Sequence, residues 1–474
     1  MSCMNGGLLA IMIILTISGK IEKSFLTLGM TCTNETLNKT RHKLEEWQMK
    51  MVIFTLGSRG DVQPYVALAK AAILKGHRAV ICTGKSFQAL IEENGVEFEQ
   101  ATSDLMAMLE TEEGKMIVTH PLRHPIKTKH YLNTVVNPAF RQTLDDFYRC
   151  AKGASVIIYH PKALGTPDIA KALGIPCVSI PPIPITYPIE EFPNLAIHSH
   201  KNFGKTLNKL TYTLMGKAES ASIKEVNDFR EKTLGLPKRK SGVYAFEIDG
   251  KEIPIIYPVS KALFPEVKNW ENKVSLPGFF YLKNEGEALE ARITAFIQAG
   301  PAPIVLTFSS MPVKSPARFQ AIVTEALRET GDRAIIVIGN SGLSFESKED
   351  QLILQAVPHH LLFPLAKGII HHGGVGTMAA ALKSGRPQLI IPFAVDQPFW
   401  AHRLARLGYA LEPLTEKQLT KERLVQRLNE FNDPKVKQQA QAIRQIIAKE
   451  QGVDDAITLI EKMVRESQLV NQKG

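Results

Sequence analysis

Apolar stretches of strand length alternate along this chain with segments that have helical periodicity. The run Met51–Leu56 is followed by residues 62–75, in which apolar side chains recur every three or four positions. Residues 156–159 and 163–173 repeat this order, and a second series begins at residue 304. Continuously apolar strands joined by helices are typical of parallel sheets covered on both faces. The pattern therefore predicts an α/β protein with two tandem Rossmann-like, doubly wound domains facing each other across a cleft.

Three parts of the chain follow from this pattern. Residues 49–285 are predicted to form an N-terminal domain, and residues 300–474 a C-terminal domain that ends in a helical tail. Residues 1–48 are interpreted as an extension outside the fold. Their apolar run Leu8–Ile17 has the length of a signal-peptide core, but no Lys or Arg precedes it, and a genuine signal peptide stays the alternative. Within the N-terminal domain, the pattern predicts one long helical stretch near Phe203–Leu234.

Composition narrows the class of protein. With 44% hydrophobic and 22% charged residues the chain is not globally disordered, and no apolar run approaches the length of a membrane span. Lys and Arg outnumber Asp and Glu by 57 to 47, and the net charge of +10 favours an anionic partner. No P-loop, zinc-finger or aromatic RNA-binding motif is present, so we do not expect nucleic acid as that partner. The five cysteines form no CxxC pair, which favours a reducing compartment, and we expect a cytoplasmic protein.

The loop after residues 368–371 has the chemistry of a phosphate-binding site. Its sequence, HHGGVGTMAAALKSG, places two histidines and three glycines before an Ala-rich helix, whose N-terminal N–H groups attract anions. A tight turn without a ligand is one alternative. Another is a nicotinamide-dependent oxidoreductase, because Gly374, Gly376 and Ala379 satisfy the dinucleotide fingerprint and Asp396 follows Gly376 by 20 residues. Against that alternative, the motif does not follow the first strand of its domain.

The loop after the first strand, GSRGDVQP, carries a candidate catalytic carboxylate. Asp61 is predicted either to cap the next helix or to act as a general base at a strand end, and a carboxylate has oxygens for both. An ordinary Asp, with a pKa of ~3.9, is a weak base. We identify no helper for it in the sequence; the histidines that come into question by number alone are His120, His124 and His130.

Together, three motifs resemble the UDP-glycosyltransferase superfamily, and its sterol and lipid glucosyltransferase branch above all. They are GSRGDVQP, the upstream Val357-Pro358-His359, and HHGGVGTMAAALKSGRPQLIIPFAVDQPFW. The resemblance covers residue 49 to the end of the chain. It implies the glycosyltransferase B architecture, with an acceptor bound by the N-terminal domain and a nucleotide-sugar donor bound by the C-terminal domain.

The resemblance also implies roles for single residues. Asp61 would be the general base, and His372 would bind the donor diphosphate. Ser310 matches a family Gly-Ser-Met motif that reads Ser309-Ser310-Met311 here, so its donor contact is less well supported. The further implied donor contacts are Ser58 and Arg59 in the first loop, His359 near the nucleotide, Val375, Gly376 and Thr377 at the phosphates, and Asp396 and Gln397 at the sugar hydroxyls.

These inferences lead to an expected reaction. We expect an inverting glycosyltransferase that moves a hexose, most simply glucose from UDP-glucose, to a hydroxyl of a lipid, sterol-like or other hydrophobic acceptor. No Asp-x-Asp motif is present, so we expect no metal and no cofactor besides the UDP-sugar donor. The alternatives are the nicotinamide-dependent oxidoreductase and a catalytically silent protein that binds a nucleotide sugar or a lipid.

A basic stretch suggests a further partner. Between His198 and Lys240 the chain has ten basic and only four acidic residues, interleaved with apolar ones. Such a surface is either an ordinary solvated helix face or a site that attracts anionic lipids. We expect peripheral contact with an anionic membrane surface on the cytoplasmic side.

Overall fold

The computed structural model describes residues 47–104, 107–108, 111, 113–114, 125–195, 197, 201–244, 246–267, 270, 273–282, 286–308 and 313–471. Contacts divide the chain into two units, Met1–Gln48 and Met49–Gly474, and the account below concerns the second. None of the helices in the described residues is long and apolar enough to cross a bilayer.

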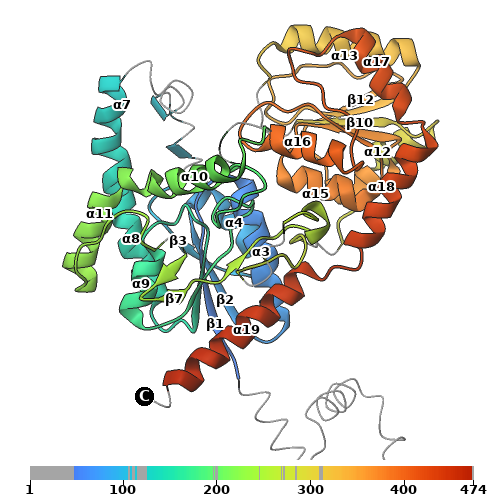
Figure 1. Ribbon diagram of the computed structural model, residues 1–474. Helices are drawn as coiled ribbons and strands as arrows, with labels where there is room; N and C mark the ends of the chain where they lie inside the picture. Colours follow the sequence, from blue (N-terminus) through green and yellow to red (C-terminus); the bar gives the residue numbers. More distant parts are fainter. Residues whose placement is uncertain are drawn as a thin grey trace, which may run out of the picture. The chain divides into compact units, whose positions relative to one another are not determined.

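The N-terminal domain is built on a parallel sheet, seven-stranded in the part of the chain that the structure describes (Figure 1). Its central strands are buried along their whole length, as expected when helices cover both faces. The strands, in spatial order, are β3 (Glu97–Gln100), β2 (Arg78–Thr83), β1 (Lys50–Phe54), β4 (Val156–Tyr159), β5 (Cys177–Ser179), β8 (Ile255–Ile256) and β9 (Val274–Ser275).

The order of these strands places a switch point between β1 and β4. Strands β2 and β3 lie on one side of β1, whereas β4 and β5 continue on the other. Their helices are α3 (Arg59–Leu74), α4 (Gln88–Glu92), α7 (Pro125–Tyr131), α8 (Asn137–Ala151), α9 (Thr166–Leu173), α10 (Lys205–Gly216) and α11 (Ile223–Phe229). Shorter elements are η2 (Lys85–Phe87), η3 (Leu132–Val136), η4 (Lys217–Ala221), η5 (Arg230–Leu234), η6 (Lys261–Leu263) and the hairpin of β6 (Glu247–Ile248) and β7 (Lys251–Glu252).

The helical stretch predicted near Phe203–Leu234 is confirmed, although it is not one continuous α-helix. The segment is divided into α10, η4, α11 and η5. Gly216, a poor helix former, ends α10. The turn that follows is held by a tertiary contact, because Glu219 accepts hydrogen bonds from the guanidinium of Arg239, which also pairs with the buried Asp168. Periodicity along the chain does not reveal such a contact.

The C-terminal domain has a parallel sheet of its own. Its described strands, in spatial order, are β12 (Gln351–Leu354), β11 (Ala334–Val337), β10 (Ile304–Thr307), β13 (Gly368–His371) and β14 (Gln388–Ile390). The switch point lies between β10 and β13. The helices are α12 (Ala291–Gln298), α13 (Pro316–Thr330), α14 (His359–Leu362) with η7 (Phe363–Leu365), α15 (Val375–Ser384), α16 (Gln397–Arg406), α17 (Lys421–Glu430) and α18 (Pro434–Ile447). The predicted α/β class with two doubly wound domains is confirmed.

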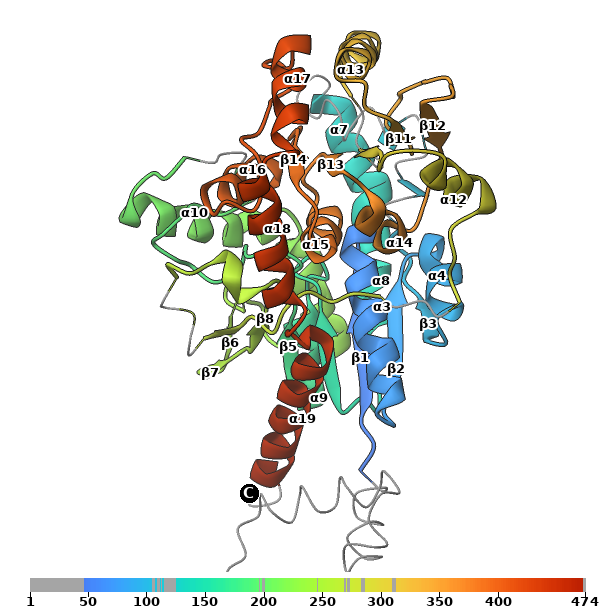
Figure 2. The same cartoon turned by 90° about the vertical axis from the view of Figure 1, so that its right-hand side faces the viewer.

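The last helix, α19 (Gly452–Asn471), returns to the N-terminal domain and packs on α3 (Figures 1 and 2). The ring of His77 lies 2.9 Å from the carboxylate of Glu461, and Lys75 pairs with Asp454. The helical tail that the sequence predicts at the end of the chain therefore contacts both domains.

Candidate active site

Two loops of the N-terminal domain meet at the switch point of its sheet. Strands β1 and β4 pair directly, with Phe54 opposite Tyr159, so the loops that follow them emerge side by side. Ligands of open parallel sheets bind at this place. The first loop carries Asp61 and the second carries His160, whose Nε2 lies 3.0 Å from Oδ1 of Asp61.

The backbone of the first loop is shaped around the Asp61 carboxylate. Asp61 is the third residue of α3 and not its N-cap, which is Ser58; the predicted capping position was wrong. Its Oδ2 accepts hydrogen bonds from the Ser58 N–H at 2.7 Å and the Ser58 hydroxyl at 2.9 Å. Gly57 has φ 139°, and a Cβ there would lie 2.3 Å from Oδ2. Only glycine permits this close approach.

The protonation of His160 is set by its neighbours. The Lys162 N–H donates to Nδ1 at 2.9 Å, so the ring proton resides on Nε2 and is donated to Asp61. The side chain is 3% exposed, and this burial lowers the pKa of His160 although the Asp61 carboxylate opposes the shift. Because both ring nitrogens are engaged, His160 orients the carboxylate and leaves the role of base to Asp61.

Asp61 is held in its ionised form. Burial alone would raise the pKa of Asp61, but the hydrogen bond from His160 and the charge of Lys162, whose Nζ lies 2.9 Å from Oδ2, bring it well below its usual range. Among the described residues, Oδ2 accepts three hydrogen bonds and Oδ1 only that of His160. Oδ1 is therefore the oxygen with room for an incoming hydroxyl.

The helper for Asp61 was not found in the sequence, although a signal existed. His160 directly follows the apolar strand β4, and the strand across the switch point from β1 is where a partner for Asp61 must emerge. Of the histidines considered, His120 and His124 lie outside the described residues. His130 lies in α7, and the described contacts of Asp61 do not include it.

The glycine-rich loop of the C-terminal domain follows β13 at the other switch point. Gly374 is the N-cap of α15 and offers no side chain to its N–H groups. A Cβ on Gly374 would lie 2.4 Å from Nε2 of His372, so glycine is required for the imidazole to lie over the loop. The first turn of α15, with Val375, Gly376 and Thr377, therefore begins without a side-chain cap, and the binding of an anion there stays a prediction.

The two adjacent histidines have different surroundings. His371 is fully buried, with Nε2 at 2.8 Å from Gln388 and Nδ1 accepting the Gly373 N–H. Burial lowers the pKa of His371 to about 3, and its contacts are structural. His372 keeps Nδ1 buried without a hydrogen-bond partner among the described residues, and burial lowers its pKa to about 4. His372 is thus a neutral imidazole, and its Nε2 is the ring atom on the side of Gly374.

His359 stands at the start of α14 and lies near both loops. Its ring stacks on Phe363 with centroids 4.5 Å apart. Burial lowers the pKa of His359 to about 4, and the positive charge of Arg59 acts in the same direction. Arg59 belongs to the N-terminal domain, so its charge acts on a histidine of the C-terminal domain.

Asp396 and Gln397 begin α16. The Asp396 Oδ2 accepts a hydrogen bond from the Trp400 indole at 2.8 Å. Gln397 uses its Oε1 to accept the N–H groups of Phe393 and Ala394, so only its NH₂ is available to a ligand. Burial raises the pKa of Asp396, and the negative charge of Asp61 raises it further. The candidate base and the candidate sugar-binding acid therefore belong to one site.

The predicted site residues are accounted for as follows. Ser58, Arg59 and Asp61 lie after β1, and His372 with the start of α15 lies after β13, each beside a switch point. His359 follows the edge strand β12, and the start of α16 follows the edge strand β14. Ser310 lies outside the described residues. In the described parts of the chain, no group of three or more His, Cys, Asp or Glu side chains could hold a metal ion. The roles of the site residues stay predictions.

Two doubly wound domains, one with a glycine-rich loop at a helix start and one with a strand-end carboxylate, form the architecture of a glycosyltransferase of the B type. The solved structure of the kitacinnamycin glycotransferase has this fold, with a TM-score of 0.66 and 19% identity over 88% of this chain and 98% of that one. Residues 51–158 match the glycosyltransferase family 28 N-terminal domain. Residues 335–458 match the C-terminal domain of erythromycin biosynthesis protein CIII-like proteins.

Two curated relatives come from Arabidopsis thaliana. Sterol 3-beta-glucosyltransferase UGT80A2 is 32% identical over 417 residues, which cover 86% of this chain and 64% of the relative. Sterol 3-beta-glucosyltransferase UGT80B1 is 30% identical over 421 residues, 86% of this chain and 67% of the relative. The chain belongs to the UDP-glycosyltransferase superfamily, in its sterol glucosyltransferase branch, which confirms the resemblance. It spans about two thirds of the length of these relatives.

Proposed function

We propose that this protein is an inverting glucosyltransferase that transfers glucose from UDP-glucose to the hydroxyl of a sterol. The observation that carries the proposal is the Asp61 carboxylate at the switch point of the N-terminal sheet, with Nε2 of His160 at 3.0 Å from its Oδ1. The names of the relatives support a sterol as the acceptor and glucose as the sugar.

The geometry supports a direct displacement. The acceptor hydroxyl would donate to Oδ1 of Asp61 and attack the anomeric carbon from the face opposite UDP. The pKa of Asp61 is low, so the proton would move late, once the new C–O bond has made the hydroxyl acidic. The negative charge on the departing diphosphate would be stabilised by the free N–H groups at the start of α15 and by His372.

The test is a transfer assay with the purified full chain. UDP-glucose would be offered with sterols, fatty alcohols and glycerolipids, and products would be identified by mass spectrometry together with UDP release. We expect a sterol monoglucoside with the β configuration at the anomeric carbon. UDP binding without UDP release for every acceptor would instead indicate a silent binding protein. A change of NADH absorbance with substrate would indicate an oxidoreductase.

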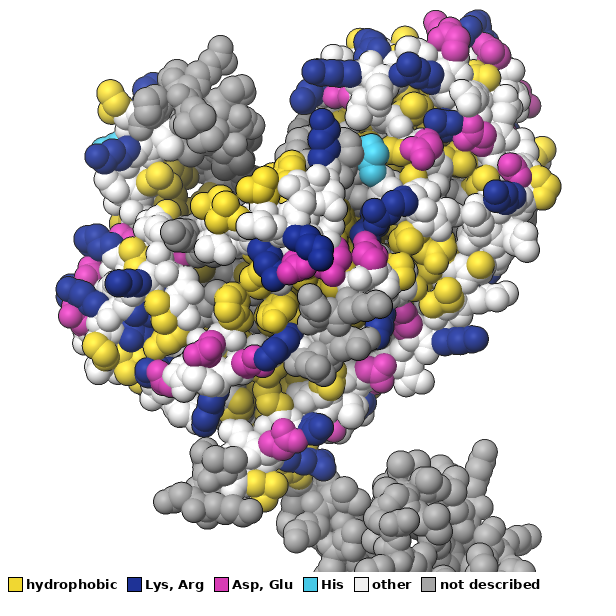
Figure 3. All heavy atoms as spheres, in the orientation of Figure 1, with side chains coloured by type: hydrophobic (Ala, Val, Ile, Leu, Met, Phe, Trp, Pro, Cys, Tyr) yellow, Lys and Arg dark blue, Asp and Glu magenta, His cyan; other side chains and the backbone are white. Residues whose placement is uncertain are grey.

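We propose in addition that α10 brings the acceptor site to an anionic membrane surface. Part of the basic surplus is neutralised, because Lys205 and Lys209 both pair with Glu190. The same helix, however, exposes Leu207 and Leu214 by 55% and 56%. Figure 3 shows hydrophobic side chains gathered over α10 with Lys and Arg side chains beside them. Exposed apolar residues with flanking cations suit an anionic bilayer.

Sedimentation with vesicles tests this contact. The chain should sediment with phosphatidylserine-containing vesicles, less so at high salt, and little with phosphatidylcholine alone. Leu207→Glu with Leu214→Glu should abolish the binding and leave transfer to a detergent-dispersed sterol intact. Leu74→Glu, on an 81% exposed residue of α3, is the matched control and should change neither. Equal binding of both variants would refute the role of α10.

A further inference from the structure

Trp400 bonds both the side chain and the backbone of Asp396. The indole Nε1 of Trp400 donates to Oδ2 at 2.8 Å, and the Trp400 backbone N–H donates to the Asp396 carbonyl at 3.1 Å. The two residues are four positions apart, so one turn of α16 brings them together. With Oδ2 occupied in this way, Oδ1 is the oxygen left for a ligand.

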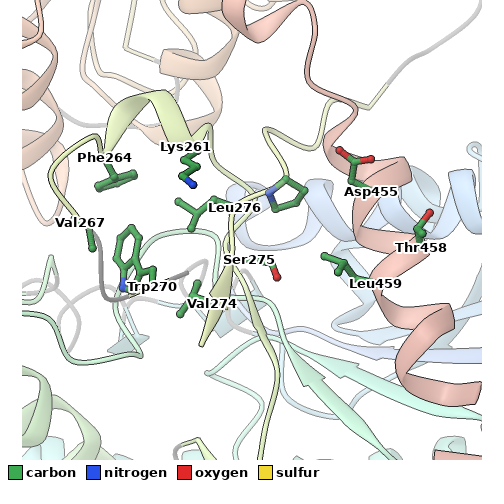
Figure 4. Close-up of a pocket in the computed structure, with 11 residues that line it drawn as sticks. Lys261, Phe264, Val267, Trp270, Val274, Ser275, Leu276, Asp455, Thr458 and Leu459 are labelled. Carbon is green, nitrogen blue, oxygen red and sulfur yellow. The ribbon is translucent and has the colours of Figure 1, made fainter. Parts of the chain in front are cut away.

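The Trp400 ring has its orientation fixed by packing. It is 0% exposed and meets Phe399 and Phe264 edge to face, with centroids 5.3 Å and 5.8 Å apart. Phe264 comes from the other domain, between η6 and β9, and its far side lines a cavity of about 540 Å³ (Figure 4). The direction of the indole N–H is therefore set by the interior of the protein and does not depend on a ligand.

Such a fixed donor matters because Asp396 is partly buried. A buried carboxylate without a partner tends to take up a proton or to rotate towards water, and burial does raise the pKa of Asp396. The indole N–H favours the ionised form and defines one orientation. An ionised oxygen in a defined position is a strong acceptor for sugar hydroxyls.

We propose that Trp400 is the positioning residue for donor-sugar recognition: it fixes the Asp396 carboxylate so that Oδ1 meets the hydroxyls of the transferred sugar. This inference rests on the proposed function. Trp400 itself touches neither the sugar nor the nucleotide. Its loss should weaken the binding of the UDP-sugar and leave that of UDP unchanged, since UDP lacks the sugar hydroxyls.

The test compares the dissociation constants of UDP and UDP-glucose by calorimetry. Trp400→Phe removes the donor, and we expect the dissociation constant of UDP-glucose to rise roughly 10-fold while that of UDP stays within twofold. Because a smaller ring also leaves a void, a second variant carries benzothienylalanine at position 400, which keeps the shape of indole but has sulfur in place of the N–H. This variant should show the same selective rise in the dissociation constant of UDP-glucose, and its melting temperature should stay close to that of the wild type.

Phe264→Leu is the matched control. It removes a ring contact of Trp400 beside an existing cavity and leaves the indole N–H in place, so it should lower the melting temperature without changing the ratio of the two dissociation constants. A wild-type ratio in the benzothienylalanine variant would refute the role of Trp400. A wild-type chain that binds UDP but not UDP-glucose would refute the proposed function instead.

Discussion

Replacing His160 with alanine tests how the catalytic carboxylate is held. The side chain donates to Oδ1 of Asp61 over 3.0 Å. Without it, the carboxylate would be held only through Oδ2, by Ser58 and by Lys162, whose side chain is 52% exposed and not fixed by packing. A hydrogen bond to a charged group contributes about 1.5–3 kcal/mol, which corresponds to roughly 10- to 150-fold in rate if it is fully expressed in the transition state.

The assay measures UDP release at saturating donor and acceptor. We expect the turnover of His160→Ala to fall within that range, while the affinity for UDP stays unchanged, because His160 belongs to the acceptor side of the site. His160→Gln keeps a distal N–H donor and should recover much of the turnover.

The control is a second buried histidine–carboxylate pair. His77 lies 2.9 Å from Glu461 where α19 meets the N-terminal domain. His77→Ala should lower the melting temperature as His160→Ala does, but turnover below the melting transition should stay at the wild-type level. Near-normal turnover of His160→Ala, or an equal loss in both variants, would refute the positioning of Asp61 by His160.

Four further predictions concern the same site. Asp61→Asn should lower turnover by ~100-fold or more with little change in UDP affinity, as measured by UDP release and calorimetry; near-normal turnover would show that Asp61 only shapes the loop. His372→Ala should weaken the binding of UDP and of UDP-glucose alike, whereas Asp396→Ala should weaken the binding of UDP-glucose much more than that of UDP. An equal loss of affinity for both ligands in Asp396→Ala would contradict the contact of Asp396 with the sugar. Chelators should leave activity intact, and inhibition that Mg²⁺ or Mn²⁺ reverses would overturn this expectation. The pKa values of His359 and His372 are about 4 and that of His371 is about 3, all below the ~6.5 of a histidine in an unfolded chain. As the pH falls from 6.5 towards 4, the unfolded chain therefore binds more protons than the folded one and is favoured. The melting temperature should therefore fall over this range, and calorimetry that shows no change between pH 7 and pH 4.5 would contradict it.

The sequence by itself determined the class of fold and the two loops that carry the chemistry. Continuous apolar strands followed by helical periodicity identify parallel, doubly wound sheets, because a strand buried on both faces has no polar side. The loops around Asp61 and Gly374 are also readable, since glycine, capping residues and helix starts act over a few neighbouring positions. In both loops, the close approach that requires glycine lies within four residues.

Only the tertiary structure decided which distant side chains act on these loops. His160 reaches Asp61 because β4 pairs with β1, and strand order is a property of the sheet that no local pattern encodes. His371 and His372 are neighbours in sequence, yet successive residues at a strand end point in opposite directions, so one is a core residue and the other faces the ligand loop. Likewise, Trp400 packs edge to face on Phe264, a residue of the other domain. Each of these contacts joins segments that are far apart along the sequence. They form only when the chain packs, so no local sequence pattern reveals them.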